Sequence, residues 1–490
     1  MKKLKDVVSN ITASDADKIA VIFNDLKISY KDLDSLISRS VDYLSSNGVR
    51  SGHEVLLMVD NSVEFVVLLL ALFRIEATVF LLPPTLKAEE FLGITHNNKI
   101  DVSLVLDEAL PEVIDLVKEK SLRTFACHYE GVLNFKLISG ENVQLSESKD
   151  NVYALRMISS GSTGTVKQML RTGDSLILMC EAGKKSFDLD ESDIFLSFVP
   201  PVHIMGVAQI ILATYLHATL LLEKNFIPAK ILEDIEKYRA TWMMASPFVL
   251  DILAQSADQE KNDLSSMRLA VSSSGPLPQR TYESFRTRCG IPLHEIYGST
   301  ECTMVTAEID DGVFKQNVVG KPVQGVKIKI VDDSFNELAV GDVGNVATLS
   351  PMAVTEYQNN PAATKEAFIE GFVLVGDRGF VDDQGQLHIV GRSNDVINVA
   401  GKKVDPVEVE HVLLNYPGVN DAAVYGVDSG STQIVKAAIV KSQDIDLAEL
   451  KKYCRSKLSD YKIPREMILA EALPRNKTGK LMRKQLSDAG

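Results

Sequence analysis

The strongest constraint on the fold is the alternation of short apolar segments with helical segments through the first half of the chain. Residues 54–59 and 77–82 are short apolar runs, and the segment 63–73 between them has the length and composition of a helix. Further short apolar runs lie beside helical sequence at 102–106, 194–199 and 218–222. Alternation of this kind predicts an α/β fold with parallel sheets covered by helices.

Two changes of pattern divide the rest of the chain. Segments 326–331 and 344–349 alternate polar and apolar side chains, with Gly and Asp between them, which predicts a small antiparallel, barrel-like β subdomain at about 320–391. Beyond residue 391 the pattern predicts a compact α+β unit, with a helix at 404–415, strands at 419–426 and 434–441, and a helical face of Leu447, Leu450, Cys454 and Leu458.

The length of the chain supports this division. At 490 residues it exceeds what one ordinary core organises. We therefore expect an N-terminal domain at 1–391, a connection at 392–394, and a C-terminal domain at 395–490. The size of this last unit is ordinary for a small domain.

A loop at 157–167 points to a nucleotide. It is rich in Ser, Thr and Gly and is closed by Lys167. Gly permits the backbone geometry that turns several N–H groups toward one anion, and the lysine adds a point charge. The spacing is not that of a P-loop NTPase, because Lys167 follows Gly164 by three residues and precedes Gln168. Taken by itself, the loop is equally compatible with a flexible surface turn.

Further polar motifs follow in order. Tyr297-Gly298-Ser299-Thr300-Glu301 comes after a strand-like run at 292–296 and combines a ring, a tight turn, hydroxyls and a carboxylate. These groups can stack on a base, contact phosphate and hold Mg²⁺. The segment 376–379 presents Asp377 in a turn that suits ribose hydroxyls, and 391–392 follows it. Lys480 lies in a Gly-containing turn near the end of the chain.

Each of these motifs also has an ordinary structural interpretation. Lys480 could belong to a solvated basic tail, Tyr297 could be a core residue, and Asp377 could cap a turn. His203 could be a buried histidine that takes no part in any reaction. The order in which the motifs occur is what favours the functional interpretation.

Composition excludes several classes of function. The net charge of −14, from 52 basic and 66 acidic residues, disfavours nucleic-acid binding. Five dispersed cysteines and eight scattered histidines predict neither a disulfide framework nor a metal cluster, and they favour a reducing cytoplasm. The basic start is not followed by an apolar core, unlike a signal peptide. The apolar runs 66–73 and 210–222 are shorter than the roughly 18 residues of a membrane span, and we expect both to be buried helices.

Taken together, the motifs resemble the AMP-forming adenylating superfamily of acyl-CoA synthetases, luciferases and peptide-synthetase adenylation domains. The resemblance covers nearly the whole chain, since 28–33 and 77–84 look like the family's two early motifs. It is closest to a free-standing acyl- or aryl-CoA ligase. The implied fold is a large N-terminal domain of parallel sheets with a β subdomain, followed by a small mobile C-terminal domain.

The resemblance also assigns expected roles. The phosphate loop would comprise Ser159, Ser160, Gly161, Ser162, Thr163, Gly164 and Lys167. Tyr297 would stack on adenine, Thr300 would contact phosphate and Glu301 would ligate Mg²⁺. Asp377 would bind the ribose with Arg392 beside it. Lys480 would bridge the carboxylate and the α-phosphate, Asn394 would be the hinge, and Gly401 would approach the thiol tunnel.

The same resemblance outlines a substrate pocket, with His203 as a wall between acyl group and nucleotide. Its expected lining is His203, Met205, Gly206, Ser246, Pro247, Phe248, Ser274, Gly275, Gly298, Ser299, Val305 and Thr306. This mixture of small and apolar groups suits an aryl or short-to-medium acyl acid. An α-amino acid is disfavoured because 195–205 contains no aspartate for its ammonium.

The implied reaction uses ATP, Mg²⁺ and coenzyme A, in a monomer or homodimer. One alternative is an acyl-AMP ligase that loads the phosphopantetheine of a separate carrier protein. The other is a catalytically silent nucleotide-binding homologue, against which the presence of Lys167, Glu301, Asp377 and Lys480 argues.

Overall fold

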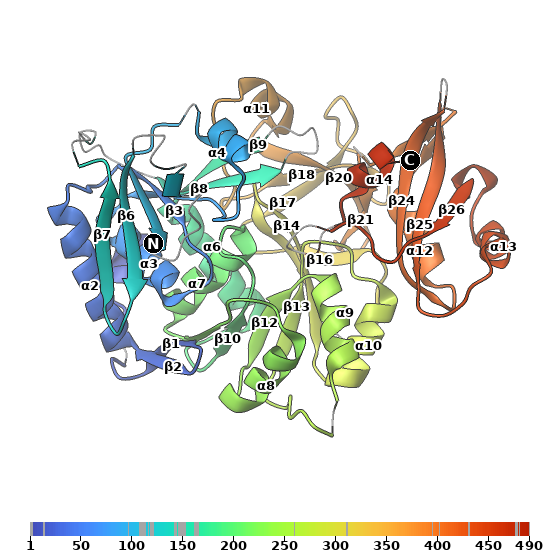
Figure 1. Ribbon diagram of the computed structural model, residues 1–490. Coiled ribbons are helices and arrows are strands. Elements are labelled where there is room, and N and C mark those ends of the chain that lie inside the picture. Colours follow the sequence, from blue (N-terminus) through green and yellow to red (C-terminus); the bar gives the residue numbers. More distant parts are fainter. Residues whose placement is uncertain are drawn as a thin grey trace.

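The computed structural model describes residues 3–489 apart from 13–14, 97, 107–113, 116, 118–121, 142–144, 146–152, 161–165, 259, 310–311, 394, 401, 430–431, 476–478 and 480. Within these residues the chain has an α/β fold with two large sheets, which confirms the fold class predicted from the strand–helix alternation (Figure 1). No described helix is both long enough and apolar enough to cross a bilayer.

The first sheet has the order β7-β6-β5-β3-β4-β8-β9. Its inner strands are parallel, whereas β7 and β9 run antiparallel at the two edges. The strands are β3 (Glu54–Met58), β4 (Thr78–Leu81), β5 (Val102–Leu106), β6 (Arg123–Tyr129), β7 (Leu133–Ser139), β8 (Tyr153–Ser160) and β9 (Val166–Thr172).

The second sheet contains a parallel run in the order β1-β11-β10-β12-β13-β14, with β2 antiparallel at one end. These strands are β1 (Ile19–Phe23), β2 (Leu26–Ser29), β10 (Ile194–Ser197), β11 (Thr219–Leu222), β12 (Trp242–Ala245), β13 (Leu269–Ser272) and β14 (Leu293–Ser299).

Antiparallel strands continue this sheet beyond β14 in the order β15-β16-β21-β20-β18-β17, and β19 pairs with β20. The antiparallel region predicted from alternating polarity is therefore joined to the parallel sheet through β16. The strands are β15 (Thr303–Glu308), β16 (Val318–Pro322), β17 (Lys327–Val331), β18 (Gly344–Leu349), β19 (Phe368–Ile369), β20 (Phe372–Val381) and β21 (Leu387–Arg392).

The main core includes apolar side chains from both sheets and from the helices packed with them. Its helices are α1 (Leu4–Ser9), α2 (Tyr30–Ser46), α3 (Val63–Ile75), α6 (Gly173–Phe187) and α7 (Ile204–Leu216). α3 is apolar on all sides because it is enclosed, as its almost continuous burial shows. A second core is formed with α8 (Pro228–Tyr238), α9 (Pro247–Ser256) and α10 (Gln279–Cys289). Peripheral helices are α4 (Ala88–Thr95) and α11 (Pro361–Ala367).

The C-terminal part has its own apolar core. Leu450 and Cys454 are fully buried, as the predicted helical face requires. In Figure 1 this part, orange to red, lies beside β20, β21, α9 and α10. Its elements are β22 (Ile397–Val399), β23 (Lys402–Val404), α12 (Pro406–Leu414), β24 (Val419–Ser429), β25 (Thr432–Lys441), α13 (Leu447–Lys457), the 3₁₀ helix η1 (Asp460–Lys462), β26 (Glu466–Leu469) and α14 (Arg483–Ala489).

Three local predictions were wrong. The run 210–222 is not one helix but the end of α7 followed by β11. The strand predicted at 292–296 continues as β14 through Ser299, so the turn begins only at Thr300. Asp377 lies within β20 opposite Arg392, not in a turn. The glycines beside Asp377 permit an irregular backbone within the strand. Gly376 has a φ of 85°, and the pairing register shifts between Arg378 and Gly379.

Candidate active site

The β8–β9 hairpin presents the two described ends of the predicted phosphate loop. Ser159 is paired directly with Lys167 across the two strands, and Ser160 is paired with Val166. Gly161, Ser162, Thr163 and Gly164 lie outside the described residues, as does the side chain of Ser160. Lys167 is therefore held at the base of the loop by a regular strand, and its Nζ lies 4.4 Å from the centre of the Tyr357 ring.

Tyr357 links this lysine to the predicted magnesium ligand. Its hydroxyl donates a hydrogen bond of 2.8 Å to Oε1 of Glu301. The tyrosine is 2% exposed and the glutamate 7% exposed. Burial, followed by the charge and the hydrogen bond of Glu301, raises the pKa of Tyr357, so the hydroxyl keeps its proton and remains a donor. Lys167, Tyr357 and Glu301 thus form a continuous chain of contacts.

Arg171 fixes the turn that carries Thr300 and Glu301. This fully buried side chain comes from β9, and it donates to the carbonyls of Thr300 and Met352, the latter at 2.7 Å. Burial lowers its pKa to about 10, which leaves it charged at neutral pH. A buried cation bonded to two carbonyls orders the backbone at both, because leaving it unsatisfied would be costly.

A second cluster brings together Tyr297, Asp377 and Arg392. The Tyr297 hydroxyl donates to Oδ2 of Asp377 at 2.7 Å, and Nε of Arg392 donates to Oδ1 at 2.8 Å. Arg392 also donates to the carbonyl of Val375 at 3.0 Å. Burial and the Asp377 charge raise the pKa of Tyr297. Burial lowers the Arg392 pKa, but Asp377 outweighs it and the net shift is upward. The cluster holds a carboxylate fixed beside an aromatic ring.

Gly298 allows the chain to reverse closely after Tyr297. A Cβ at this position would lie 1.8 Å from the carbonyl oxygen of Thr303 on β15, so any side chain is excluded. The register shifts between Tyr297 and Gly298. Ser299 then accepts a hydrogen bond from the Cys302 amide at 3.1 Å, and Val305 is buried in the returning strand. This return positions Thr300 and Glu301 beside Tyr297.

Part of the predicted acyl pocket is also brought together. His203 is half-buried at the N-cap of α7, and its carbonyl accepts from the amides of Gly206 and Val207. A Cβ on Gly206 would lie 2.3 Å from the Pro200 carbonyl oxygen, so the glycine permits a close approach of loop and helix.

The opposite side of this predicted pocket follows β12 and β13. Ser274 lies within 3.8 Å of the Met205 sulfur through its Oγ, and it has a φ of 73°, a strained value for a residue with a side chain. Space is open beside Gly275. Ser246 and Pro247 are buried at the start of α9, and no hydrogen-bond partner for the Ser246 Oγ occurs among the described residues.

Lys480, Asn394 and Gly401 lie outside the described residues. Gly479, the neighbour of Lys480, is described and lies against this same predicted pocket. A Cβ on Gly479 would be 2.9 Å from Oγ of Ser246 and 3.2 Å from Cδ1 of Phe248. Gly479 therefore reaches the large domain at residues that were predicted to line the acyl pocket.

The carboxylate of Glu301 has the arrangement expected of a ligand to a cation that also binds phosphate oxygens. Tyr357 engages Oε1, and no hydrogen bond from the described residues reaches Oε2. Among the described residues, no three His, Cys, Asp or Glu side chains gather into a metal site. A hard divalent ion here would draw its other oxygens from a nucleotide and from water, as Mg²⁺ commonly does.

Sequence reasoning missed Tyr357 and Arg171. Tyr357 precedes Asn359-Asn360-Pro361, a turn signal that marks the end of an extended segment but not what its side chains contact. Arg171 lies in strand β9, four residues beyond Lys167 and outside the loop motif, and most arginines in proteins face solvent. Neither lies in a motif that the sequence analysis singled out.

Comparison with known proteins identifies the same family that the sequence motifs resemble. A family described as AMP-binding enzyme matches residues 9–357, and its C-terminal domain matches 408–480. The chain therefore belongs to the AMP-binding enzyme family, and the AMP-forming ligase predicted from the sequence is confirmed.

Individual relatives match over nearly their full length. The chain is 29% identical to a 2-succinylbenzoate–CoA ligase of Bacillus licheniformis, covering 96% of both chains. Among solved structures, ATP-bound MatB from Rhodopseudomonas palustris has a TM-score of 0.90 at 25% identity, covering 100% of this chain and 99% of that one. The anthranilate CoA ligase AuaEII in complex with anthranoyl-AMP has a TM-score of 0.87 at 25% identity, covering 100% and 97%.

Proposed function

We propose that this chain joins a carboxylic acid to AMP with release of pyrophosphate, and then transfers the acyl group to the thiol of coenzyme A. One observation carries the proposal. Tyr297 donates to Asp377, which pairs with Arg392, and Glu301 accepts from Tyr357, whose ring lies against Lys167. The segment 297–301 thus connects, through these residues, a ring, a fixed carboxylate and a lysine that are far apart in sequence.

In the first half-reaction the acid's carboxylate oxygen attacks the α-phosphorus of ATP, and the bond to the β-phosphate breaks. Two anions approach, and charge grows on the oxygens of the transferring group. Lys167 would hold the β- and γ-phosphates, while Lys480 would lie between carboxylate and α-phosphate. The contribution of these groups is position and charge, so no acid–base pair is needed.

The nucleoside would be held by the second cluster. Asp377 would accept hydrogen bonds from the ribose hydroxyls, with Arg392 fixing the carboxylate and the Tyr297 ring against the base. Mg²⁺, bound at Glu301, would neutralise phosphate charge. Tyr357 would keep that carboxylate oriented before and after the ion arrives.

In the second half-reaction a thiolate attacks the carbonyl of the acyl-AMP and AMP leaves. Rotation about Asn394 would withdraw Lys480 and bring the turn at Gly401 toward the thiol entrance. The domain division at 391–395 is part of this proposal. So are a cytoplasmic location, which the five buried cysteines fit, and a monomer or homodimer as the working form.

The substrate we propose is an aromatic or short-to-medium acyl acid. The pocket residues named above are small or apolar, with the half-buried His203 at one end. Two of the relatives described act on or bind aryl acids, according to their names.

The test is acyl-thioester formation with ATP, Mg²⁺ and a panel of benzoic, anthranilic, succinylbenzoic and C4–C10 acids. Each acid is offered with coenzyme A or with a carrier protein bearing phosphopantetheine, and products are separated by mass. We expect acyl-CoA and AMP in equal amounts. Thioester on the carrier alone would replace coenzyme A by the carrier as acceptor. Absence of thioester on either acceptor, and of acyl hydroxamate in parallel reactions with hydroxylamine, with every acid would favour a silent nucleotide-binding protein.

A further inference from the structure

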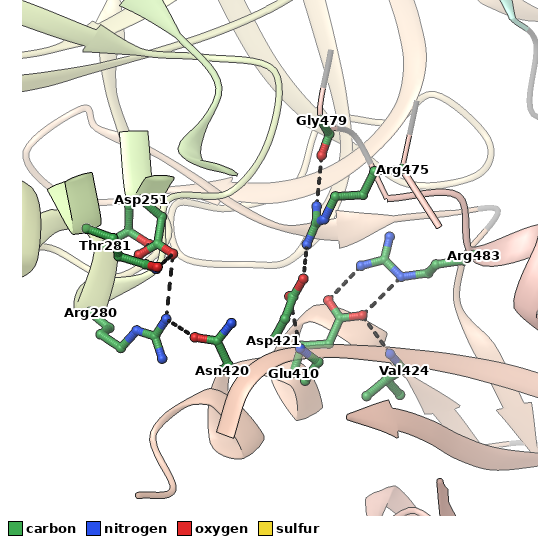
Figure 2. Close-up of polar contacts among 12 residues, drawn as sticks. Asp251, Arg280, Thr281, Glu410, Asn420, Asp421, Val424, Arg475, Gly479 and Arg483 are labelled. Carbon is green, nitrogen blue, oxygen red and sulfur yellow. Dashed lines mark hydrogen bonds and ion pairs between the residues drawn. The ribbon is translucent and has the colours of Figure 1, made fainter. Parts of the chain in front are cut away.

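Arg475 occupies a junction between the two parts of the chain, five residues before Lys480. Its guanidinium carbon lies 4.9 Å from the centre of the Phe248 ring at the start of α9. Nη1 donates to the carbonyl of Gly479 at 2.8 Å, and Nη2 donates to Oδ2 of Asp421 at 2.7 Å. Figure 2 shows this side chain between Gly479 and Asp421. One planar group thus makes three contacts in three directions.

The contact with Gly479 fixes the end of a short reversal. Arg475 and Leu481 form an antiparallel bridge, and the Met482 amide donates to the Pro474 carbonyl at 2.9 Å. Gly479 has a φ of 82° and lies too close to Ser246 and Phe248 to carry a side chain easily. The backbone on each described side of Lys480 is therefore tied to Arg475, at Gly479 by a hydrogen bond and at Leu481 by the bridge.

The contact with Asp421 attaches this reversal to a second crossing point. Arg280 on α10 donates to the Val419 carbonyl at 3.1 Å. It also donates to Oδ1 of Asn420 at 3.0 Å (Figure 2). Asp251 lies 3.6 Å from the same guanidinium. Asp421 follows Asn420 directly, so the anchor of Arg475 is itself held against the large domain.

These contacts have different fates if the C-terminal part rotates. The bonds of Arg475 to Gly479 and Asp421 lie within that part and can persist. Its contact with Phe248, and those of Arg280 with Val419 and Asn420, cross to the large domain and exist only in this arrangement. The arrangement described here is the one in which the neighbour of Lys480 touches the predicted acyl pocket.

We infer that Arg475 is a positioning residue for Lys480 in the adenylation half-reaction. Asp421 holds the Arg475 guanidinium, and Arg280 holds the segment of Asp421 against the large domain. The inference rests on the proposed function. Lysine should not replace Arg475, because its compact ammonium lacks the planar fork that reaches Gly479 and Asp421 while lying over Phe248. Misplacement of a reacting charge by about 1 Å can cost on the order of 100-fold in rate.

The experiment measures the two half-reactions separately in Arg475→Ala, Arg475→Lys and Arg280→Ala, using an acid that the wild type accepts. Adenylation is followed by ATP–pyrophosphate exchange, and thioester formation by reaction of supplied acyl-AMP with coenzyme A. Lys436→Ala is the matched control, since it removes an ion pair with Glu466 in the same part of the chain, far from Gly479 in sequence.

We expect Arg475→Ala and Arg475→Lys to lower the exchange rate by about 10- to 100-fold, with KM for ATP and thioester formation changed less than about threefold. Arg280→Ala, which leaves the C-terminal reversal intact, should lower exchange by about 3- to 10-fold, and Lys436→Ala should leave both steps unchanged. Equal loss of both steps, full rescue by lysine, or normal exchange in Arg475→Ala would overturn the inference. Absence of acid-dependent exchange in the wild type would instead overturn the proposed function.

Discussion

Removing one hydroxyl by Tyr357→Phe tests whether the tyrosine orients Glu301. The phenylalanine keeps the ring under Lys167, 4.4 Å from Nζ, and removes only the donor of the 2.8 Å bond to Glu301. Because both partners are at most 7% exposed, the carboxylate oxygen left without its donor is not readily solvated. A hydrogen bond to a charged group contributes about 1.5–3 kcal/mol in such a setting.

The loss has two expected consequences. The large domain should unfold at a lower temperature, with a free-energy change of about 1.5–3 kcal/mol. If about 1.4 kcal/mol of that loss falls on the geometry of Glu301, the Mg²⁺ concentration for half-maximal adenylation should rise about tenfold. Both quantities are measurable, the first by differential scanning calorimetry and the second by Mg²⁺ titration of ATP–pyrophosphate exchange.

Tyr30→Phe provides the control. Tyr30 is 1% exposed and donates to the neutral carbonyl of Ala218 at 2.8 Å. Losing this bond should cost about 1 kcal/mol and leave the Mg²⁺ dependence as in the wild type. Tyr357→Phe with unchanged stability and an unchanged Mg²⁺ titration would refute the role assigned to its hydroxyl.

Three further predictions address other parts of the chain. Lys480→Ala should abolish adenylation while thioester formation from supplied acyl-AMP persists, and equal loss of both steps would contradict the assignment. Gly206→Ala should destabilise the fold by about 1–3 kcal/mol and raise KM for the acid, because its Cβ would lie 2.3 Å from a backbone oxygen. Gly93→Ala should be harmless in both assays, because apart from its chain neighbours and its own helix backbone no atom of the described residues lies within 4 Å of the added Cβ. Glu295, whose pKa burial raises to about 8, favours folding when protonated; its contribution is complete below about pH 4.5 and is lost as pH rises through 8. The free energy of unfolding of Glu295→Gln, measured in urea relative to the wild type, should therefore rise by about 2–4 kcal/mol as the pH is raised from 5 to 8. A difference that does not change with pH would exclude this titration.

The elements that sequence predicted well are those whose pattern is set locally. The helix expected at 63–73 is α3 (Val63–Ile75), and Ser62 caps it through the Phe65 amide. The strand expected at 102–106 is β5 with the same bounds. In both, the length of an apolar run and the residues at its ends specify the element with little help from distant contacts.

The local structure around the candidate site residues differs from the one predicted. Asp377 was predicted to lie in a turn and Tyr297 to follow the strand 292–296, and both lie in strands. Gly298 and Gly379 are needed because carbonyl oxygens of neighbouring strands lie 1.8 Å and 2.1 Å from where a Cβ would be. Such close approaches depend on strands that pair only in the folded chain, so a glycine alone does not distinguish a turn from a bulge.

Tyr357 could not be assigned for a related reason. Its partners Lys167 and Glu301 are distant in sequence, and each of the three is unremarkable by itself. Contact between them requires β9, the turn after β14 and the segment before α11 to converge. No spacing in the sequence encodes that convergence.

The most direct test of the central claim is ATP–pyrophosphate exchange with and without each carboxylic acid of the aryl and acyl panel, in the wild type and in Lys480→Ala. Exchange that depends on at least one acid in the wild type, and that falls to the no-acid level in the variant, is the predicted result. A wild type whose exchange stays at the no-acid level across the whole panel, or a variant that exchanges as fast as the wild type, would contradict the account.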